Sequence, residues 1–394
     1  MRKRSTILLL LMLASTLLSG CWDRTEINDV AFILISAIDL EKDGKLRYTV
    51  MVPLPGQMGG ATGGGGGGGS GGGKSYYIDS EVGNTYRECH MKLQGRMSRR
   101  MFLAHRRTIL VGEEMARKGI RDLFDTVPRS PESRMTTYLV VTQGKAYDML
   151  QSTPKFEHFP SEAIRELIKS KSVMDINFKD FGIALSLRGA DPVAVYMDVK
   201  NSEKGIEPSK EVSLKGYAQF RKDKMVGTLE DDAALGLGIL NGQKMISHSI
   251  ALQAGDGQFM SARIFEASTT IDTLLVDQQL QFKIGVKIKA TLMEDSTHYD
   301  LSQTEKSLNV EADISKRIKH ALQELIDASI KNKADSGQFG SAVWRTYPAA
   351  WKSQFENDWP QGLKDAKFDI QVQSSLVDTG LIYDNVTRER LTNE

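Results

Sequence analysis

Cysteine is scarce in this sequence, with only Cys21 and Cys89 among 394 residues. Two cysteines could form at most one bridge, so no disulfide framework stabilises the fold, and buried apolar cores must do so. Cys89 falls within a helical pattern, Ser80–Gly95, in which Val82, Tyr86 and Leu93 lie close to the same stripe. We therefore expect Cys89 to be a small buried helix residue.

Histidine is also scarce, and the familiar catalytic patterns are missing. The six histidines are His90, His105, His158, His248, His298 and His320. None of them stands at a metal-ligand spacing from another histidine or from a cysteine. No Gly-x-Ser-x-Gly nucleophile elbow occurs outside the glycine tract 59–73, and His-Glu-x-x-His is absent from the sequence. The sequence therefore predicts no metal, no cofactor and no enzymatic activity.

One formal match to a nucleotide-binding motif does occur, at Gly68-x-x-x-x-Gly73-Lys74-Ser75. A phosphate-binding loop of this type follows a buried strand and opens a helix. Here, more glycine precedes the match, and the β-prone residues Tyr76, Tyr77 and Ile78 follow it. We interpret the match as a product of local composition and expect no nucleotide to bind there.

An excess of charge of one sign is missing too. The chain has 51 Lys+Arg and 50 Asp+Glu, for a formal net charge of +1. Residues 1–20 carry three cations and no anion, so without them the charge is −2. This balance excludes the basic footprint of a nucleic-acid-binding protein and a polybasic membrane anchor.

Long apolar runs are limited to one, Ile7–Leu18, which follows the cations Arg2, Lys3 and Arg4. The run is too short for a stable membrane span and ends in Leu18-Ser19-Gly20-Cys21. This pattern predicts a lipoprotein signal peptide, residues 1–20, cleaved between Gly20 and Cys21, with the thiol of Cys21 carrying the lipid. An uncleaved N-terminal anchor with a chance cysteine is the alternative. A lipid on Cys21 would place the rest of the chain outside the cytoplasm, held at the membrane surface.

Strands and helices alternate between residues 21 and 201, which predicts a mixed sheet covered by helices. Expected strands include Val30–Ile38, Lys45–Val52, Met101–Val111 and Thr136–Thr142, and Glu113–Val127 is expected as one helix. Residues 59–73 contain twelve glycines, so we expect a flexible loop inside this N-terminal domain.

A polar segment near Ser202 marks the first boundary, and residues 202–268 are expected to form a small β-rich middle domain. It would contain the hairpin Val212–Phe220 with Met225–Leu229, and a turn-rich link at Gly236–Gly242. Residues 269–394 would form a C-terminal domain around a long amphipathic helix at 309–333. The expected fold is therefore α+β, in three domains, each with a mainly antiparallel or mixed sheet packed by helices.

The chain resembles the Ger(x)C family, the lipoprotein C subunits of spore germinant receptors. The segments that carry the likeness are Gly20-Cys21-Trp22-Asp23-Arg24 with Glu26, Ala37-Ile38-Asp39, Asp43-Gly44, Glu113–Ile120, Arg129–Arg134, Gly216–Arg221, Lys224–Gly227, Asp335–Gly340, Pro348, Trp351-Lys352 and Trp359. They span the whole chain in order. Ser36-Ala37 depart from residues that are often glycine in the family, and the glycine tract is longer than expected.

The resemblance implies three α+β domains on the outer face of the cytoplasmic membrane of a spore, its inner membrane. It also implies two membrane partners, an A-type and a B-type subunit, and a role in nutrient-triggered germination without catalysis. Palmitate on Cys21 would belong to the same picture. A solute-binding lipoprotein that captures a nutrient itself is the alternative; it predicts two similar lobes around a cleft, whereas the sequence divides into three unlike segments.

Overall fold

The structure is a computed structural model that describes residues 6, 26–54, 75–203, 208–242, 248–253, 257–297, 301 and 303–378. It is built on three sheets. The described strands are β1 (Val30–Phe32), β2 (Ile35–Leu40), β3 (Leu46–Pro53), β4 (Tyr76–Gly83), β5 (Arg100–Phe102), β6 (Thr108–Gly112), β7 (Tyr138–Thr142), β8 (Val193–Asn201), β9 (Lys210–Arg221), β10 (Lys224–Glu230), β11 (His248–Gln253), β12 (Phe259–Val276), β13 (Gln279–Asp295) and β14 (Lys367–Asp378).

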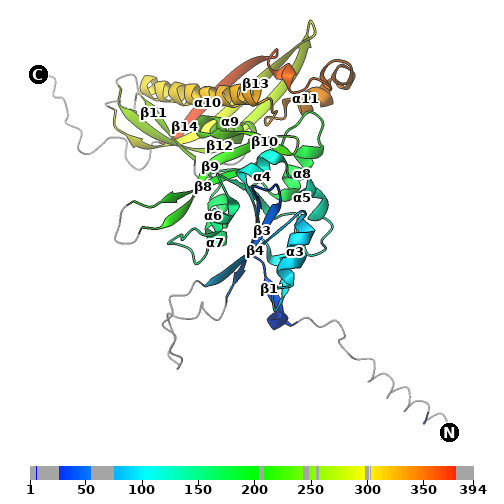
Figure 1. Ribbon diagram of the computed structural model, residues 1–394. Coiled ribbons are helices and arrows are strands. Elements are labelled where there is room, and N and C mark those ends of the chain that lie inside the picture. The colour runs from blue at the N-terminus through cyan, green and yellow to red at the C-terminus, as the bar shows by residue number, and fades with distance from the viewer. Residues whose placement is uncertain are drawn as a thin grey trace, which may run out of the picture.

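Helices lie between and over these strands (Figure 1). The described helices are α3 (Tyr86–Gln94), α4 (Glu113–Lys118), α5 (Arg121–Thr126), α6 (Ala146–Leu150), α7 (Pro160–Lys169), α8 (Phe178–Ser186), α9 (Asp231–Leu240), α10 (Thr304–Asn332), α11 (Phe339–Thr346) and α12 (Pro348–Ala350), with single turns at η1 (Ile27–Asp29), η2 (Leu103–His105), η3 (Trp351–Phe355) and η4 (Gln361–Leu363). Among them, no helix combines the length and the apolar character that a membrane crossing requires.

The largest sheet has the strand order β10-β9-β8-β7-β6-β2-β3-β4. Its four central strands, β8, β7, β6 and β2, are parallel, and antiparallel pairs extend it on both sides. β6 is buried along its whole length, and β7 along all but its first residue, as expected for strands covered on both faces. One face packs against α3, α4, α5 and α8 and the other against α6 and α7. β1 and β5 form a separate parallel pair at the lower end of the molecule.

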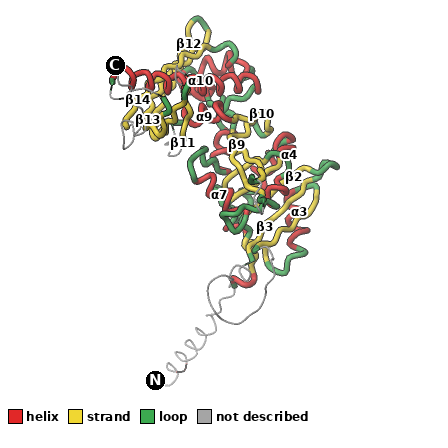
Figure 2. The backbone as a smooth tube through the Cα atoms, turned by 90° about the vertical axis from the view of Figure 1, so that its left-hand side faces the viewer, coloured by secondary structure: helices red, strands yellow, loops and turns green. Residues whose placement is uncertain are grey.

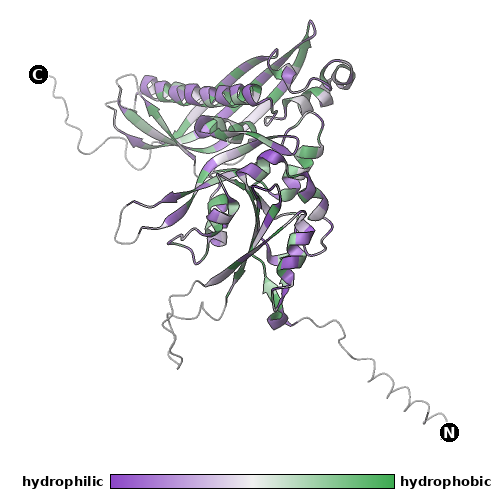
Figure 3. Ribbon diagram, in the orientation of Figure 1, coloured by the Kyte–Doolittle hydropathy of each residue, from purple (hydrophilic) through white to green (hydrophobic). Residues whose placement is uncertain are grey.

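The second large sheet, β11-β12-β13-β14, lies at the opposite end of the molecule from β3 and α3 (Figure 2). β12 and β13 form a long hairpin, and β14 returns parallel to β13 after α10. The long helix α10 covers one face with a buried stripe that includes Ile314, Ile318 and Leu325. Figure 3 shows the polar residues of α10 on its outer side. The predicted helix at 309–333 is therefore present and begins five residues earlier.

The α+β class and the mixed or antiparallel sheets predicted from the sequence are confirmed. The segment 202–268 does not form a sheet of its own in the described part of the chain. Its hairpin β9–β10 extends the eight-stranded sheet, and its strands β11 and β12 belong to the four-stranded sheet. The domain boundaries at 202 and 269 stay a prediction.

Two local predictions were wrong, and in both cases glycine is the reason. The segment Gly236–Gly242 is mostly helix α9, and a Cβ on Gly236 would lie 2.2 Å from the carbonyl oxygen of Ala321 in α10. The two glycines of α9 therefore do not mark a turn, and Gly236 permits close helix packing. The predicted helix Glu113–Val127 is divided into α4 and α5 at Gly119, which has a φ of +127°.

Candidate functional site

Several segments that carry the family resemblance meet at one buried polar joint between the two large sheets. We call Asp191, Arg221, Asp335, Gly340 and Trp359 the inter-sheet joint. Asp191 lies just before β8, Arg221 ends β9, and the other three residues follow α10. Both aspartates are buried. The joint therefore connects residues that are far apart in the sequence.

Asp335 is surrounded by hydrogen-bond donors from its own side of the joint. Its carboxylate accepts hydrogen bonds from the backbone N–H of Phe339 (3.0 Å) and of Gly340 (2.7 Å) and from the indole N–H of Trp359 (2.9 Å). Burial, together with a smaller contribution from the charge of Asp191, raises the pKa of this carboxyl to about 7 against the lowering effect of these hydrogen bonds.

Asp191 links the two sides of the joint. Its backbone N–H donates to the carbonyl oxygen of Asp335 (3.1 Å), and its carboxylate accepts from the backbone N–H of Asp335 (2.9 Å). The same carboxylate pairs with the guanidinium of Arg221 at 3.1 Å, and Arg221 also donates to the carbonyl oxygen of Trp359. The carboxylate of Asp191 thus contacts both β9 of the eight-stranded sheet and the segment after α10, which covers the four-stranded sheet. The joint therefore fixes how the two sheets sit relative to each other.

The backbones also approach closely at this joint. Gly189 has a φ of +66°, and a Cβ there would lie 2.4 Å from the carbonyl carbon of Gly340 and 2.7 Å from the ring of Trp351. A Cβ on Gly340 would lie 2.4 Å from the indole nitrogen of Trp359. Glycine is therefore required on both sides of the contact. The sequence analysis missed Gly189 and Asp191, because no local pattern shows that this loop meets the segment after α10.

Two further buried polar groups organise the eight-stranded sheet. Asp39 accepts the backbone N–H groups of Ala146 (2.7 Å) and Tyr147 (2.8 Å), so it binds the N-terminal end of α6. Burial raises the pKa of Asp39, and these two hydrogen bonds oppose the rise. The guanidinium of the buried Arg106 donates to the hydroxyls of Tyr86 (3.2 Å) and Ser133 (3.3 Å), which attaches the loop 129–134 to the sheet.

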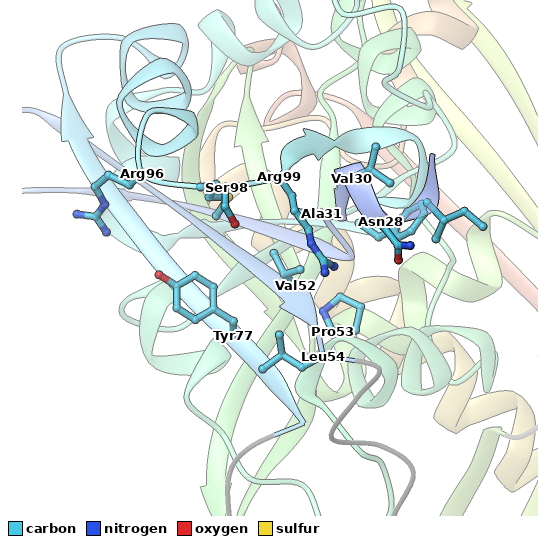
Figure 4. A pocket seen from close by; sticks show the side chains of 13 residues that line it. Asn28, Val30, Ala31, Val52, Pro53, Leu54, Tyr77, Arg96, Ser98 and Arg99 are labelled. Atoms are coloured by element: carbon cyan, nitrogen blue, oxygen red, sulfur yellow. The ribbon is translucent and has the colours of Figure 1, made fainter. Parts of the chain in front are cut away.

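A cavity of about 780 Å³ lies at the opposite end of the molecule, where the described chain begins (Figure 4). We call it the N-terminal pocket. Its lining consists of Ile27, Asn28, Val30, Ala31, Phe32, Val52, Pro53, Leu54, Tyr77, Arg96, Met97, Ser98 and Arg99. This lining is apolar on the strand side and holds two arginines and no acidic residue.

The predicted lipid-attachment and cleavage residues, Cys21 and Gly20, lie outside the described residues, as does the glycine tract 59–73. Cys89 is where it was expected, buried in α3 as a free thiol that donates to the carbonyl oxygen of Leu46. The part of the chain that the structure describes contains no group of three or more His, Cys, Asp or Glu side chains placed to hold a metal ion.

Comparison with known proteins defines the family. A family model described as "Spore germination protein N-terminal domain" matches residues 23–199, and one described as "Spore germination B3/ GerAC like, C-terminal" matches residues 215–380. Together they cover most of the chain. The protein therefore belongs to the Ger(x)C family of spore germination proteins, as the motifs predicted.

Individual relatives match over nearly their full length. The chain is 31% identical over 377 residues to "Putative spore germination protein YfkR" of Bacillus subtilis (strain 168), covering 95% of this chain and 97% of the relative. It is 26% identical over 406 residues to "Spore germination protein KC" of the same organism, covering 96% and 97%. The solved structure titled "Crystal Structure of the GerBC protein" superimposes with a TM-score of 0.55 at 16% identity, over 87% of this chain and 96% of that chain. That likeness shows the fold.

Proposed function

We propose that this protein is the lipid-anchored subunit of a nutrient germinant receptor. Cys21 would carry the lipid on the outer face of the cytoplasmic membrane, which in a spore is the inner membrane. The protein would act through contacts with integral-membrane A-type and B-type subunits and not through catalysis. The observation that carries the proposal is the match to both family models over most of the chain.

An anchor at Cys21 would hold the folded body close to the membrane. The first described element after Cys21 begins at Ile27. Six residues of fully extended chain reach at most about 20 Å, so an acylated Cys21 would keep this end of the body at the bilayer surface. A protein confined in this way meets membrane partners at a high effective concentration, and individually weak contacts then suffice.

The solute-binding alternative predicts two similar lobes around a cleft. The two large sheets are unlike, one with eight strands and one with four, and the pocket beside the joint between them, which Asp191 and Ser336 line, has a volume of only about 170 Å³. These observations favour a subunit that binds proteins over one that captures a nutrient.

Deletion in the spore tests the proposal. Spores that lack this protein should lose the response to the nutrient and should keep nutrient-independent germination. Calorimetry of the purified protein with candidate germinants should show no binding at physiological concentrations. Tight binding of a nutrient by the isolated protein would favour the solute-binding alternative.

Mass spectrometry tests the anchor separately. The membrane form should begin at Cys21 and carry acyl chains, and Cys21→Ala should leave an uncleaved precursor without lipid. Acyl chains found on any other residue of the variant would contradict the assignment of Cys21.

A further inference from the structure

The N-terminal pocket stands where the predicted lipid tether enters the folded body. Ile27 and Asn28 form its rim, and they are separated from Cys21 by only a few residues. If Cys21 carries the lipid, the reach of at most about 20 Å leaves this end of the body facing the bilayer and places the four-stranded sheet far from it (Figure 1). Any surface that contacts lipid must therefore lie at this end.

The side chains at the rim suit the boundary between water and lipid. Ile27 is 77% exposed and Tyr77 is 47% exposed, although both are large and have apolar surface. Tyr77 donates its hydroxyl to Asp79 at 2.9 Å, so its ring is held at the surface. Aromatic and aliphatic side chains of this kind gather at membrane interfaces, where one part is apolar and another is hydrated.

The two arginines of the pocket differ in what they are free to bind. Arg96 is already paired with Glu81 at 2.7 Å and with Asp79. No ion pair in the described part of the chain involves the exposed Arg99. Figure 4 shows the Arg99 side chain extending between Asn28 and Val52, over Pro53. The pocket therefore presents one uncompensated guanidinium beside an apolar wall.

The loop that carries Arg99 is fixed from α3. The side-chain amide of Gln94 donates to the carbonyl oxygen of Arg99 (3.0 Å) and accepts the backbone N–H of Met101 (2.8 Å). These two bonds hold the backbone that directly follows the Arg99 Cα in place before any ligand arrives. A guanidinium carried on a fixed backbone is suited to a phosphate group, which it binds through paired N–H donors.

We propose that the N-terminal pocket binds the phosphate headgroup of an anionic phospholipid in the membrane that holds the anchor. Arg99 pairs with the phosphate, and Ile27, Leu54 and Tyr77 contact the glycerol and upper acyl region. The inference rests on the proposed lipid anchor. With the tether alone the body is free to rotate, whereas a second contact beside the tether fixes its orientation toward membrane partners.

Spin labelling of the full-length acylated protein in vesicles tests the proposal. A label at Ser98→Cys, on the exposed rim of the pocket, is selective because Cys89 is buried and Cys21 is acylated. The label should be less accessible to a water-soluble nickel relaxant on phosphatidylglycerol vesicles than on phosphatidylcholine vesicles. A label at the exposed Ser375 in β14 should show no difference.

Molecules whose label is shielded from nickel are counted as docked. Arg99→Gln should lower the ratio of docked to undocked molecules about five-fold on phosphatidylglycerol vesicles, which is the effect expected of one cation at an anionic surface. Arg129→Gln removes one charge from a side chain that is 76% exposed and does not line the pocket, and it should leave the ratio unchanged. Both substitutions are at exposed positions, so neither threatens folding.

Flotation of each sample with the vesicles separates this proposal from the anchor. Protein that does not float has no working anchor, which would contradict the proposed function and the headgroup site with it. Protein that floats but shows equal nickel access on both lipids, or an equal effect of the two substitutions, would overturn the headgroup site alone. Excess inorganic phosphate on phosphatidylcholine vesicles should not reproduce the change; if it does, the pocket binds free phosphate and not a lipid.

Discussion

The two large sheets of this protein are buried in different ways. The eight-stranded sheet has helices on both faces, and its central strands β6 and β7 are buried along almost their whole length. The four-stranded sheet is covered by α10 on one face, and β13 alternates between buried and more exposed residues along most of its length. The four-stranded sheet therefore buries apolar side chains on one face only. Its stability depends more on the helices that cover this face and on the inter-sheet joint than the stability of the eight-stranded sheet does.

Asp335→Ala should have the largest effect, because it breaks the joint that ties the two sheets together. Three buried N–H donors, from Phe339, Gly340 and Trp359, would lose their acceptor. The expected loss of unfolding free energy is roughly 3–5 kcal/mol. Amide hydrogen exchange should then speed up most in β11–β14 and least in β6 and β7. Equal acceleration of exchange in both sheets would show that the four-stranded sheet depends on the joint no more than the eight-stranded sheet does.

The pH dependence of Asp335 should be the next largest effect. Its folded pKa of about 7 lies above the value of about 4 for an unfolded chain, so the folded state holds the proton more tightly between these values. The contribution of this group to stability is therefore full below about pH 4 and is lost as the pH rises to about 7, by no more than about 4 kcal/mol.

Asp335→Asn cannot ionise and provides the matched control. In urea unfolding, the variant should gain stability relative to the parent protein between about pH 4 and about pH 7, with a constant difference above that range. A difference that is constant over the whole range would mean that Asp335 keeps an ordinary pKa in the folded protein.

Gly236→Ala should lower stability by disturbing the packing of α9 on α10. Its Cβ would overlap the carbonyl oxygen of Ala321, so α9 must move away from α10, at a cost of about 1–3 kcal/mol. Gly95→Ala is a suitable control, because the nearest atom to its Cβ would be 3.4 Å away. Thermal unfolding of both variants checks this, and equal melting temperatures would contradict the close packing of α9 on α10.

Shortening the glycine tract 59–73 by half should have the smallest effect. The tract joins β3 to β4, which pair in full register from Leu46 to Pro53. Loop-closure entropy changes slowly with length, so the free energy of unfolding should shift by under about 1 kcal/mol. A larger loss, or ATP binding that depends on Lys74, would contradict the passive role predicted for this tract.

Local patterns in the sequence predicted most elements but not their partners. The stripe of Ile314, Ile318 and Leu325 predicts α10 because its period matches a helix. By contrast, the glycines of α9 favour a turn by composition, and the close approach of α10 to Gly236 depends on a contact between segments distant in the sequence. The family motifs indicated that Arg221, Asp335 and Trp359 matter, but their meeting with Asp191 depends on contacts between distant segments. The N-terminal pocket around Arg99 likewise forms from segments that are distant in the sequence.

Purification of the tagged full-length protein from spore membranes tests the central claim most directly. Two integral-membrane proteins, the A-type and B-type subunits of one receptor, should co-purify with it in mild detergent and should be absent from a matched preparation of the Cys21→Ala variant. Recovery of the acylated protein without either subunit, after cross-linking in intact membranes, would contradict the account.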